Sequence, residues 1–136
     1  MIVIDASLMV AWLIGEVDPK AEDDISALLY QNKVVVPSHW PLEIGNALNT
    51  NVRRGRIPSG DLLPLQDRFL GLDISVERSL EVGDIVDLTS FALAHNLTVY
   101  DAAYVRLAQQ HSVPLATLDR AMRGAARHLS IPLLPD

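Results

Sequence analysis

Short apolar runs alternate with longer amphipathic stretches along most of the chain. Turn-forming or polar residues bound each apolar run, which is typical of short buried strands, and the predicted strands are residues 2–4, 34–36, 73–76, 114–118 and 131–134. The stretches between them have helical periodicity or helix-start residues, which predicts helices at 6–14, 19–31, 41–54, 59–70, 79–95, 101–111 and 120–128. This alternation predicts an α/β fold, a three-layer α/β/α sandwich around a parallel sheet of four to five strands.

Length and composition are those of one globular domain. The 136 residues match the commonest domain size, so residues 1–136 are expected to form a single unit with its own core. The chain has no cysteine, which excludes a disulfide framework, a zinc–thiolate site and a thiol nucleophile. The sequence has neither a signal-peptide pattern nor an apolar run of about 20 residues, so we expect a cytoplasmic protein with no membrane partner.

The acidic balance gives no simple answer about a nucleic-acid partner. A formal net charge of −6 argues against phosphate binding. Arginines nevertheless occur in two local groups, Arg53, Arg54 and Arg56 in one and Arg120, Arg123 and Arg127 in the other. The first group is either a solvated helix end or a rim that contacts phosphates.

Four acidic residues stand where the chain leaves an apolar element. Asp5 follows the first predicted strand, Glu43 lies in the first turn of the helix after the second, Asp101 opens a helix, and Asp119 follows the strand at 114–118. Right-handed crossovers place the carboxyl ends of parallel strands along one edge, where such sheets bind ligands. The pattern therefore predicts that the four carboxylates converge at that edge.

Carboxylates that converge need a compensating charge. Two of them about 4 Å apart repel by roughly 4 kcal/mol at an effective dielectric of 20. A divalent cation removes this repulsion, and oxygen ligands without histidine favour Mg²⁺ or Mn²⁺ over Zn²⁺. Such a site can activate water for attack on a phosphodiester. The alternative is that each acid only caps a helix or compensates its dipole.

Four sequence blocks together resemble one known family. The blocks are IVIDAS at the start, PSHWPLEIGNAL at 37–48, TVYDAAYVRLAQQ at 98–110 and PLATLDRAM at 114–122. In their order and intervals they resemble the PIN-domain ribonucleases, and among them the VapC-like toxins of toxin–antitoxin pairs. The resemblance implies that Asp5, Glu43, Asp101 and Asp119 hold Mg²⁺ or Mn²⁺ in a metal-dependent endoribonuclease. It also implies hydrolysis to 5′-phosphate and 3′-hydroxyl ends, a VapB-like antitoxin as partner, and a homodimer.

Three further residues are predicted to support the acids. Ser7 follows Asp5 by two residues and could orient it or a metal-bound water. Thr117 alternates with Asp119 along a strand, so both face one side and the Thr117 hydroxyl could reach phosphate or a ligand. Asn46 lies one helical turn after Glu43. Tyr104 stands in the same relation to Asp101, although packing is its commoner role.

Other functions stay open from sequence. A PIN-type nuclease that processes RNA or DNA without being a toxin fits the same residues, as does a binding module that sequesters a partner without catalysis. A haloacid-dehalogenase-type phosphatase would need an acid where this chain has Ser7. The four histidines have no metal-binding spacing and offer no obvious catalytic pair. The two tryptophans, Trp12 and Trp40, are expected in the core or in a dimer interface.

Overall fold

A five-stranded parallel sheet forms the centre of the protein in a computed structural model that describes all 136 residues. The strands are β1 (Ile2–Ile4), β2 (Val34–Val36), β3 (Ile74–Val76), β4 (Leu115–Ala116) and β5 (Leu133–Leu134). They lie in the order β3-β2-β1-β4-β5, and every neighbouring pair is parallel. The predicted parallel sheet is confirmed, with β4 and β5 shorter than their apolar runs.

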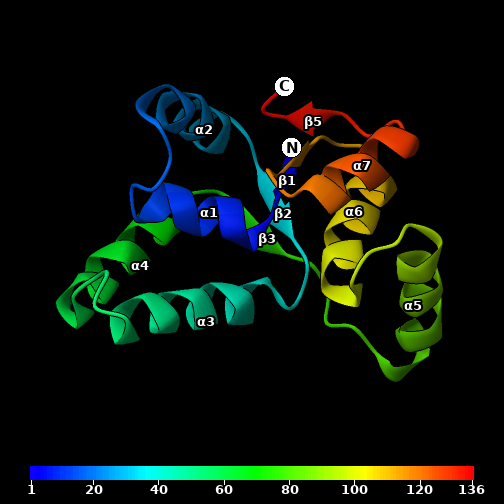
Figure 1. Cartoon of the computed structure of the whole chain (residues 1–136), viewed down its shortest axis with the longest axis horizontal. Helices are drawn as coiled ribbons and strands as arrows, with labels where there is room; N and C mark the ends of the chain where they lie inside the picture. Colours follow the sequence, from blue (N-terminus) through cyan, green and yellow to red (C-terminus); the bar gives the residue numbers. More distant parts are fainter.

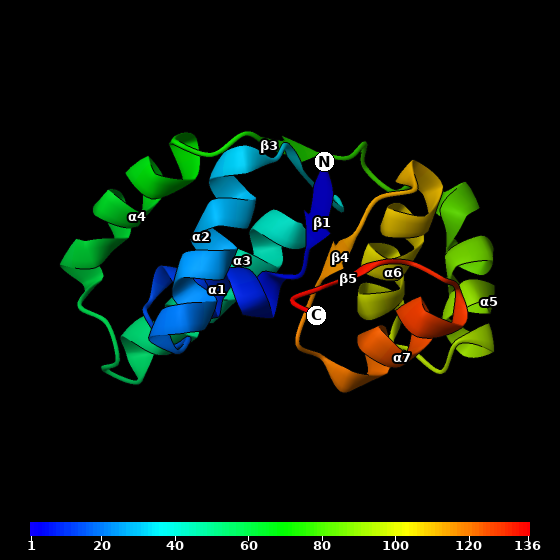
Figure 2. The ribbon, with the colours of Figure 1, turned by 90° about the horizontal axis from the view of Figure 1, so that it is seen from above.

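Helices cover both faces of the sheet. They are α1 (Ala6–Leu13), α2 (Pro19–Gln31), α3 (Trp40–Arg53), α4 (Leu62–Leu70), α5 (Ile85–Ala94), α6 (Val99–His111) and α7 (Arg120–His128). The four helices that precede β3 lie on one side, and the three that follow it lie on the other (Figures 1 and 2). This is the three-layer α/β/α arrangement that the sequence predicts.

The strand order reverses beside β1. The chain runs outward from β1 to β2 and β3, then returns to place β4 on the opposite side of β1. A crevice at the carboxyl ends of the strands forms at such a reversal, and ligands of open α/β sheets bind there. The residues that follow β1 and β4 are therefore the first place to look for a site.

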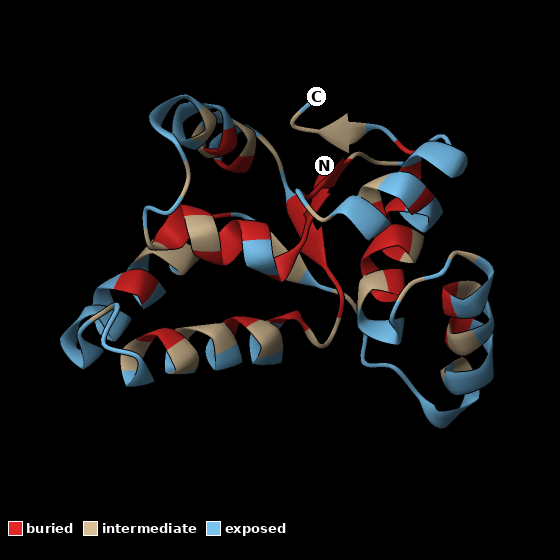
Figure 3. Cartoon of the chain, viewed as in Figure 1, coloured by how far each residue is buried: buried red, intermediate tan, exposed pale blue.

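The core is centred on β1 and β2. Both strands are buried along their whole length, and each helix turns its buried side toward the sheet or toward a neighbouring helix (Figure 3). Continuous apolar strands are what a sheet covered on both faces requires. Trp12 and Trp40 are both buried, as the sequence suggests, and Trp40 packs edge-to-face against Phe69.

Three predicted helices begin two or more residues away from the expected start. The one predicted at 79–95 starts as a 3₁₀ turn, η2 (Val82–Asp84), because Asp84 accepts hydrogen bonds from the Glu81 N–H and from Arg78, which fixes a tight turn before α5. The one predicted at 59–70 likewise starts as a 3₁₀ turn, η1 (Ser59–Asp61).

The third difference places Asp101 inside a helix rather than at its start. Helix α6 begins at Val99, because the Thr98 hydroxyl caps it by accepting a hydrogen bond from the Asp101 N–H (3.1 Å). Asp101 therefore occupies the first turn of α6 instead of opening it. None of the helices is long and apolar enough to cross a membrane.

Candidate functional site

Asp5 is a buried carboxylate held by three protein donors. Its side chain is 1% exposed and caps helix α1. Oδ1 accepts hydrogen bonds from the Leu8 N–H (2.7 Å) and from the Ser7 hydroxyl (2.8 Å), and Oδ2 accepts one from the Thr117 hydroxyl. These donors offset part of the cost of removing the carboxylate from water.

The register between β1 and β4 brings Thr117 to Asp5. Ile4 lies opposite Ala116 in the parallel ladder, and the Asp5 N–H continues it by donating to the Ala116 carbonyl (3.1 Å). The next residue of each strand is then Asp5 or Thr117, so their side chains meet although 112 positions separate them. Thr117 is fully buried, which keeps its hydroxyl away from water.

Asp119 joins the same hydrogen-bond network. Its backbone N–H donates to the Thr117 hydroxyl (3.0 Å), and its Oδ1 caps helix α7 by accepting from the Met122 N–H (2.8 Å). Thr117 therefore connects Asp5 and Asp119. No hydrogen bond engages the second carboxylate oxygen of half-buried Asp119, so that oxygen is available to a ligand.

Glu43 is positioned by two aromatic residues. The Tyr104 hydroxyl on α6 donates to Glu43 Oε1 (3.0 Å), across 61 positions of sequence. His39 Nε2 lies 2.6 Å from the same oxygen but forms no hydrogen bond, so this is a close polar contact. Burial, and then the negative charge of Glu43, raise the pKa of Tyr104, which keeps its hydroxyl protonated as a donor.

Asp101 lies within the electrostatic field of the other three acids. Partial burial raises the pKa of its carboxyl group, and the charges of Asp119, Glu43 and Asp5 raise it further. The fold brings the four predicted acids to one region at the carboxyl edge of the sheet, as the shared hydrogen bonds and the effect of three acids on Asp101 indicate.

No protein cation neutralises this region. None of Asp5, Asp101 and Asp119 forms an ion pair, and Glu43 has only His39 as a partner. At the same time, no three acidic or histidine side chains are close enough to enclose a metal ion by themselves. A hydrated Mg²⁺ fits such a set, because it is usually held by one or two carboxylates and keeps several waters.

The supporting residues predicted from sequence differ in what they contact. Ser7 and Thr117 both donate to Asp5. For Ser7 this is the contact that an orienting role requires, whereas the contact of Thr117 with Asp5 was not predicted from sequence. Asn46 is exposed on α3 and has no hydrogen bond to Glu43, so the structure gives it no positioning contact. His39 was overlooked, although it precedes Glu43 by four residues, which is the spacing of neighbours on a helix.

The arginines at the end of α3 lie away from the acids. Arg53, Arg54 and Arg56 are exposed, and ten residues of helix separate Glu43 from Arg53, which amounts to about 15 Å. Arg56 approaches Glu16 at 3.9 Å. Of the two interpretations that the sequence leaves open, the solvated helix end fits this position better.

Known proteins resemble this chain along most of its length. The model of the PIN domain family matches residues 2–128, nearly the whole chain. This chain belongs to the PIN-domain family. It is also 33% identical to Ribonuclease VapC3 of Pyrobaculum aerophilum over 125 residues, which are 89% of this chain and 91% of that protein.

Solved structures share the fold of this PIN domain. The crystal structure of PAE2754 from Pyrobaculum aerophilum matches with a TM-score of 0.63 and 24% identity, covering 91% of this chain and 84% of the other. FitAcB from Neisseria gonorrhoeae matches with a TM-score of 0.54 and 18% identity, covering 98% and 96%. At these identities the likeness concerns the fold.

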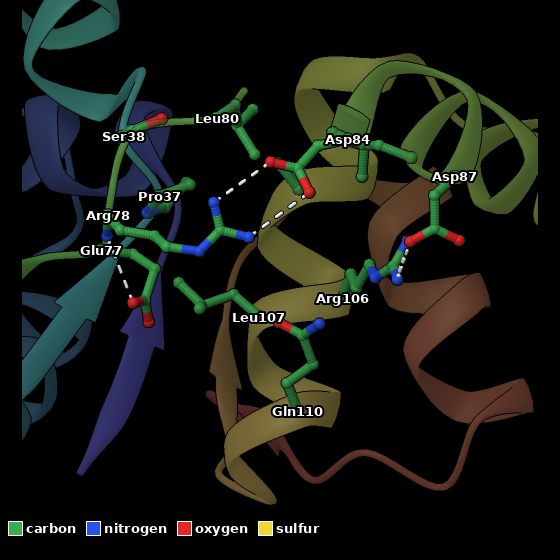
Figure 4. Close-up of a pocket in the computed structure, with 12 residues that line it drawn as sticks. Pro37, Ser38, Glu77, Arg78, Leu80, Asp84, Asp87, Arg106, Leu107 and Gln110 are labelled. Carbon is green, nitrogen blue, oxygen red and sulfur yellow. Dashed lines mark hydrogen bonds and ion pairs between the residues drawn. The ribbon is translucent and has the colours of Figure 1, made fainter. Parts of the chain in front are cut away.

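A separate cavity of about 260 Å³ lies between the ends of β2 and β3 and helices α5 and α6 (Figure 4). Four of its charged side chains pair with one another, Arg78 with Asp84 (3.2 Å) and Arg106 with Asp87, and Glu77 pairs with His111 at 2.9 Å. The backbone N–H of Glu81 and the Arg78 guanidinium lower the pKa of Asp84. None of the four converging acids lines this cavity.

The Thr117 hydroxyl is predicted to stabilise the fold of this PIN domain through Asp5. Thr117→Val keeps the volume but leaves Asp5 Oδ2 buried without its donor, which should lower the free energy of unfolding by about 1.5–3 kcal/mol. Thr117→Ser keeps the hydroxyl and loses one methyl group, so its cost should be nearer 1 kcal/mol. Urea denaturation at neutral pH measures both; a valine variant as stable as the serine variant would refute the role of the hydroxyl.

The charge of Asp101 is predicted to destabilise the protein when metal is absent. Because the folded-state pKa is raised above the ordinary 3.8, the folded protein holds this proton more tightly than the unfolded chain does. The resulting contribution to stability is lost as pH rises through that pKa. In EDTA, Asp101→Asn should therefore have a higher melting temperature than the wild type at pH 7. The difference should shrink as pH falls toward 3.8, and a gain that is independent of pH would contradict the electrostatic explanation.

Proposed function

We propose that this PIN domain is a metal-dependent endoribonuclease that acts as the toxin of a toxin–antitoxin pair. The observation that carries the proposal is the convergence of Asp5, Glu43, Asp101 and Asp119 at the topological switch of the sheet without a protein cation. The relative named Ribonuclease VapC3 supports RNA as the substrate. The name of this relative also supports the toxin role, because VapC-like proteins are the toxins of toxin–antitoxin pairs.

The chemistry of the donor set fits Mg²⁺ or Mn²⁺. All four candidate ligands are carboxylates, which hard divalent cations prefer. When bound, such a cation would supply an activated water and offset the charge of the phosphodiester. Glu43, Asp101 and Asp119 have more room to take part than Asp5, because all three are only partly buried at the starts of helices α3, α6 and α7.

The protein's own part is to hold these acids still. Asp5 is fixed through three hydrogen bonds, so it loses little freedom when a substrate arrives. Thr117 fixes the start of the loop that carries Asp119, and Tyr104 fixes Glu43 relative to the helix that carries Asp101. The acids come from four different helix starts, so the fold itself sets their separations.

The remaining parts of the proposal concern partners. A VapB-like antitoxin could silence the site by placing an arginine against the acids, since a guanidinium pairs strongly with carboxylates. The homodimer and the cytoplasmic location that the sequence suggests stay predictions.

The direct test is cleavage of labelled RNA with Mg²⁺ or Mn²⁺. Wild type should cut RNA, and EDTA should abolish cutting. Asp5→Asn should reduce the rate of cutting by about 100-fold or more, because loss of a metal ligand should cost at least as much activity as loss of a residue that only holds a ligand in place. Asparagine retains the helix cap, so the fold should survive. Asn46→Ala, which removes an exposed side chain from the same region, is the matched control and should cut like wild type.

The same assay separates metal-activated water from attack by the ribose. A single 2′-deoxy substitution at the cleaved position should leave cutting intact, because the nucleophile does not come from the RNA. The products should carry 5′-phosphate and 3′-hydroxyl ends. RNA cutting that persists in EDTA and in Asp5→Asn would refute the proposal.

A further inference from the structure

Tyr100 is a large aromatic side chain left open to solvent beside the acidic site. It is 66% exposed and directly precedes Asp101 in the first turn of α6. The Thr98 cap fixes the start of this helix, so the position of Tyr100 is set by the same turn that carries Asp101. Of the seven Phe, Trp and Tyr residues, only Tyr30 is comparably exposed, at 64%.

Aromatic packing connects Tyr100 to Glu43. The His39 ring lies against Tyr100, with ring centroids 5.7 Å apart and planes tilted by 57°. The same His39 ring packs edge-on against Tyr104 at 5.2 Å, and its Nε2 is in close contact with Glu43. One part of the Tyr100 ring is therefore supported from within the site, while the rest faces solvent.

We propose that Tyr100 stacks on an unpaired nucleobase of the RNA next to the cleaved phosphate. This inference rests on the proposed ribonuclease function. Aromatic side chains bind single strands in this way because every base has a π-face, whereas the bases of an RNA duplex are stacked inside the helix. Tyr100 is suited to the role by its open ring, its support from His39 and its place directly beside Asp101.

The test is binding of short labelled RNAs, followed by fluorescence anisotropy in Mg²⁺. All proteins carry Asp119→Asn, which keeps the α7 cap and leaves the RNA uncut. Adding Tyr100→Ala should weaken binding of single-stranded RNA by roughly 5- to 100-fold, the loss expected for one stacked base. Tyr100→Phe and Tyr100→Trp should restore binding, because both keep an aromatic face. Duplex RNA should bind equally to all of these variants.

Tyr30→Ala is the matched control. Tyr30 is as exposed as Tyr100 but lies on α2 and packs against Trp12, so its loss should leave RNA binding unchanged. RNAs with an abasic position scanned along the strand locate the stacked base. When the abasic position replaces the stacked base, the protein with Tyr100 and the Tyr100→Ala variant should bind that RNA equally. The reason is that removing either partner of one contact already loses the whole contact, so the two losses do not add.

The outcomes separate this inference from the function on which it rests. Equal binding of single-stranded RNA by Tyr100→Ala and its parent overturns the inference alone, as does an equal loss on duplex RNA. A changed oligomeric state in sedimentation, with RNA binding unchanged, would assign Tyr100 to a protein contact instead. If otherwise unmodified wild type neither binds nor cuts any RNA, the proposed function fails and the inference fails with it.

Discussion

The buried carboxylate of Asp5 is the constraint on which the surrounding structure depends. An ionised carboxylate removed from water costs several kcal/mol unless donors or a cation compensate it. The protein supplies three donors, from the start of α1, from Ser7 and from the end of β4. The register of β1 against β4 therefore also places the Thr117 hydroxyl where it donates to Asp5. A change in the pairing of these strands would change the site as well.

Helix capping and metal binding are compatible roles for these acids. Asp5 and Asp119 do cap helices α1 and α7, as the plainer interpretation of the sequence holds. Each cap uses one carboxylate oxygen, which leaves Asp119 a second oxygen, and the N–H groups at a helix start favour negative charge nearby. Caps alone do not explain why four such starts meet at one strand reversal, where Asp101 is repelled by the other three acids.

The fold and the positions of the four acids at one edge of the sheet could be predicted from sequence, because both follow from local patterns. Helices at 19–31 and 120–128 were placed correctly, since a cap and turn residues mark their ends. Thr98 followed three residues later by an acid is also a cap signal, yet the apolar run across Val99 hid the true start of α6. The contact of Tyr104 with Glu43 had no local signal, because it joins two helices 61 positions apart and depends on how they pack.

The central claim, that the four acids form one cation site, is tested most directly by thermal unfolding against Mn²⁺ concentration. A clustered site binds the folded state alone, so the melting temperature of wild type should rise as metal saturates it. Asp119→Asn, which keeps the helix cap but removes the charge, should lose most of this rise. An unchanged wild-type melting temperature across the titration, or an equal rise in the variant, would show that these residues only cap their helices or compensate the helix dipole.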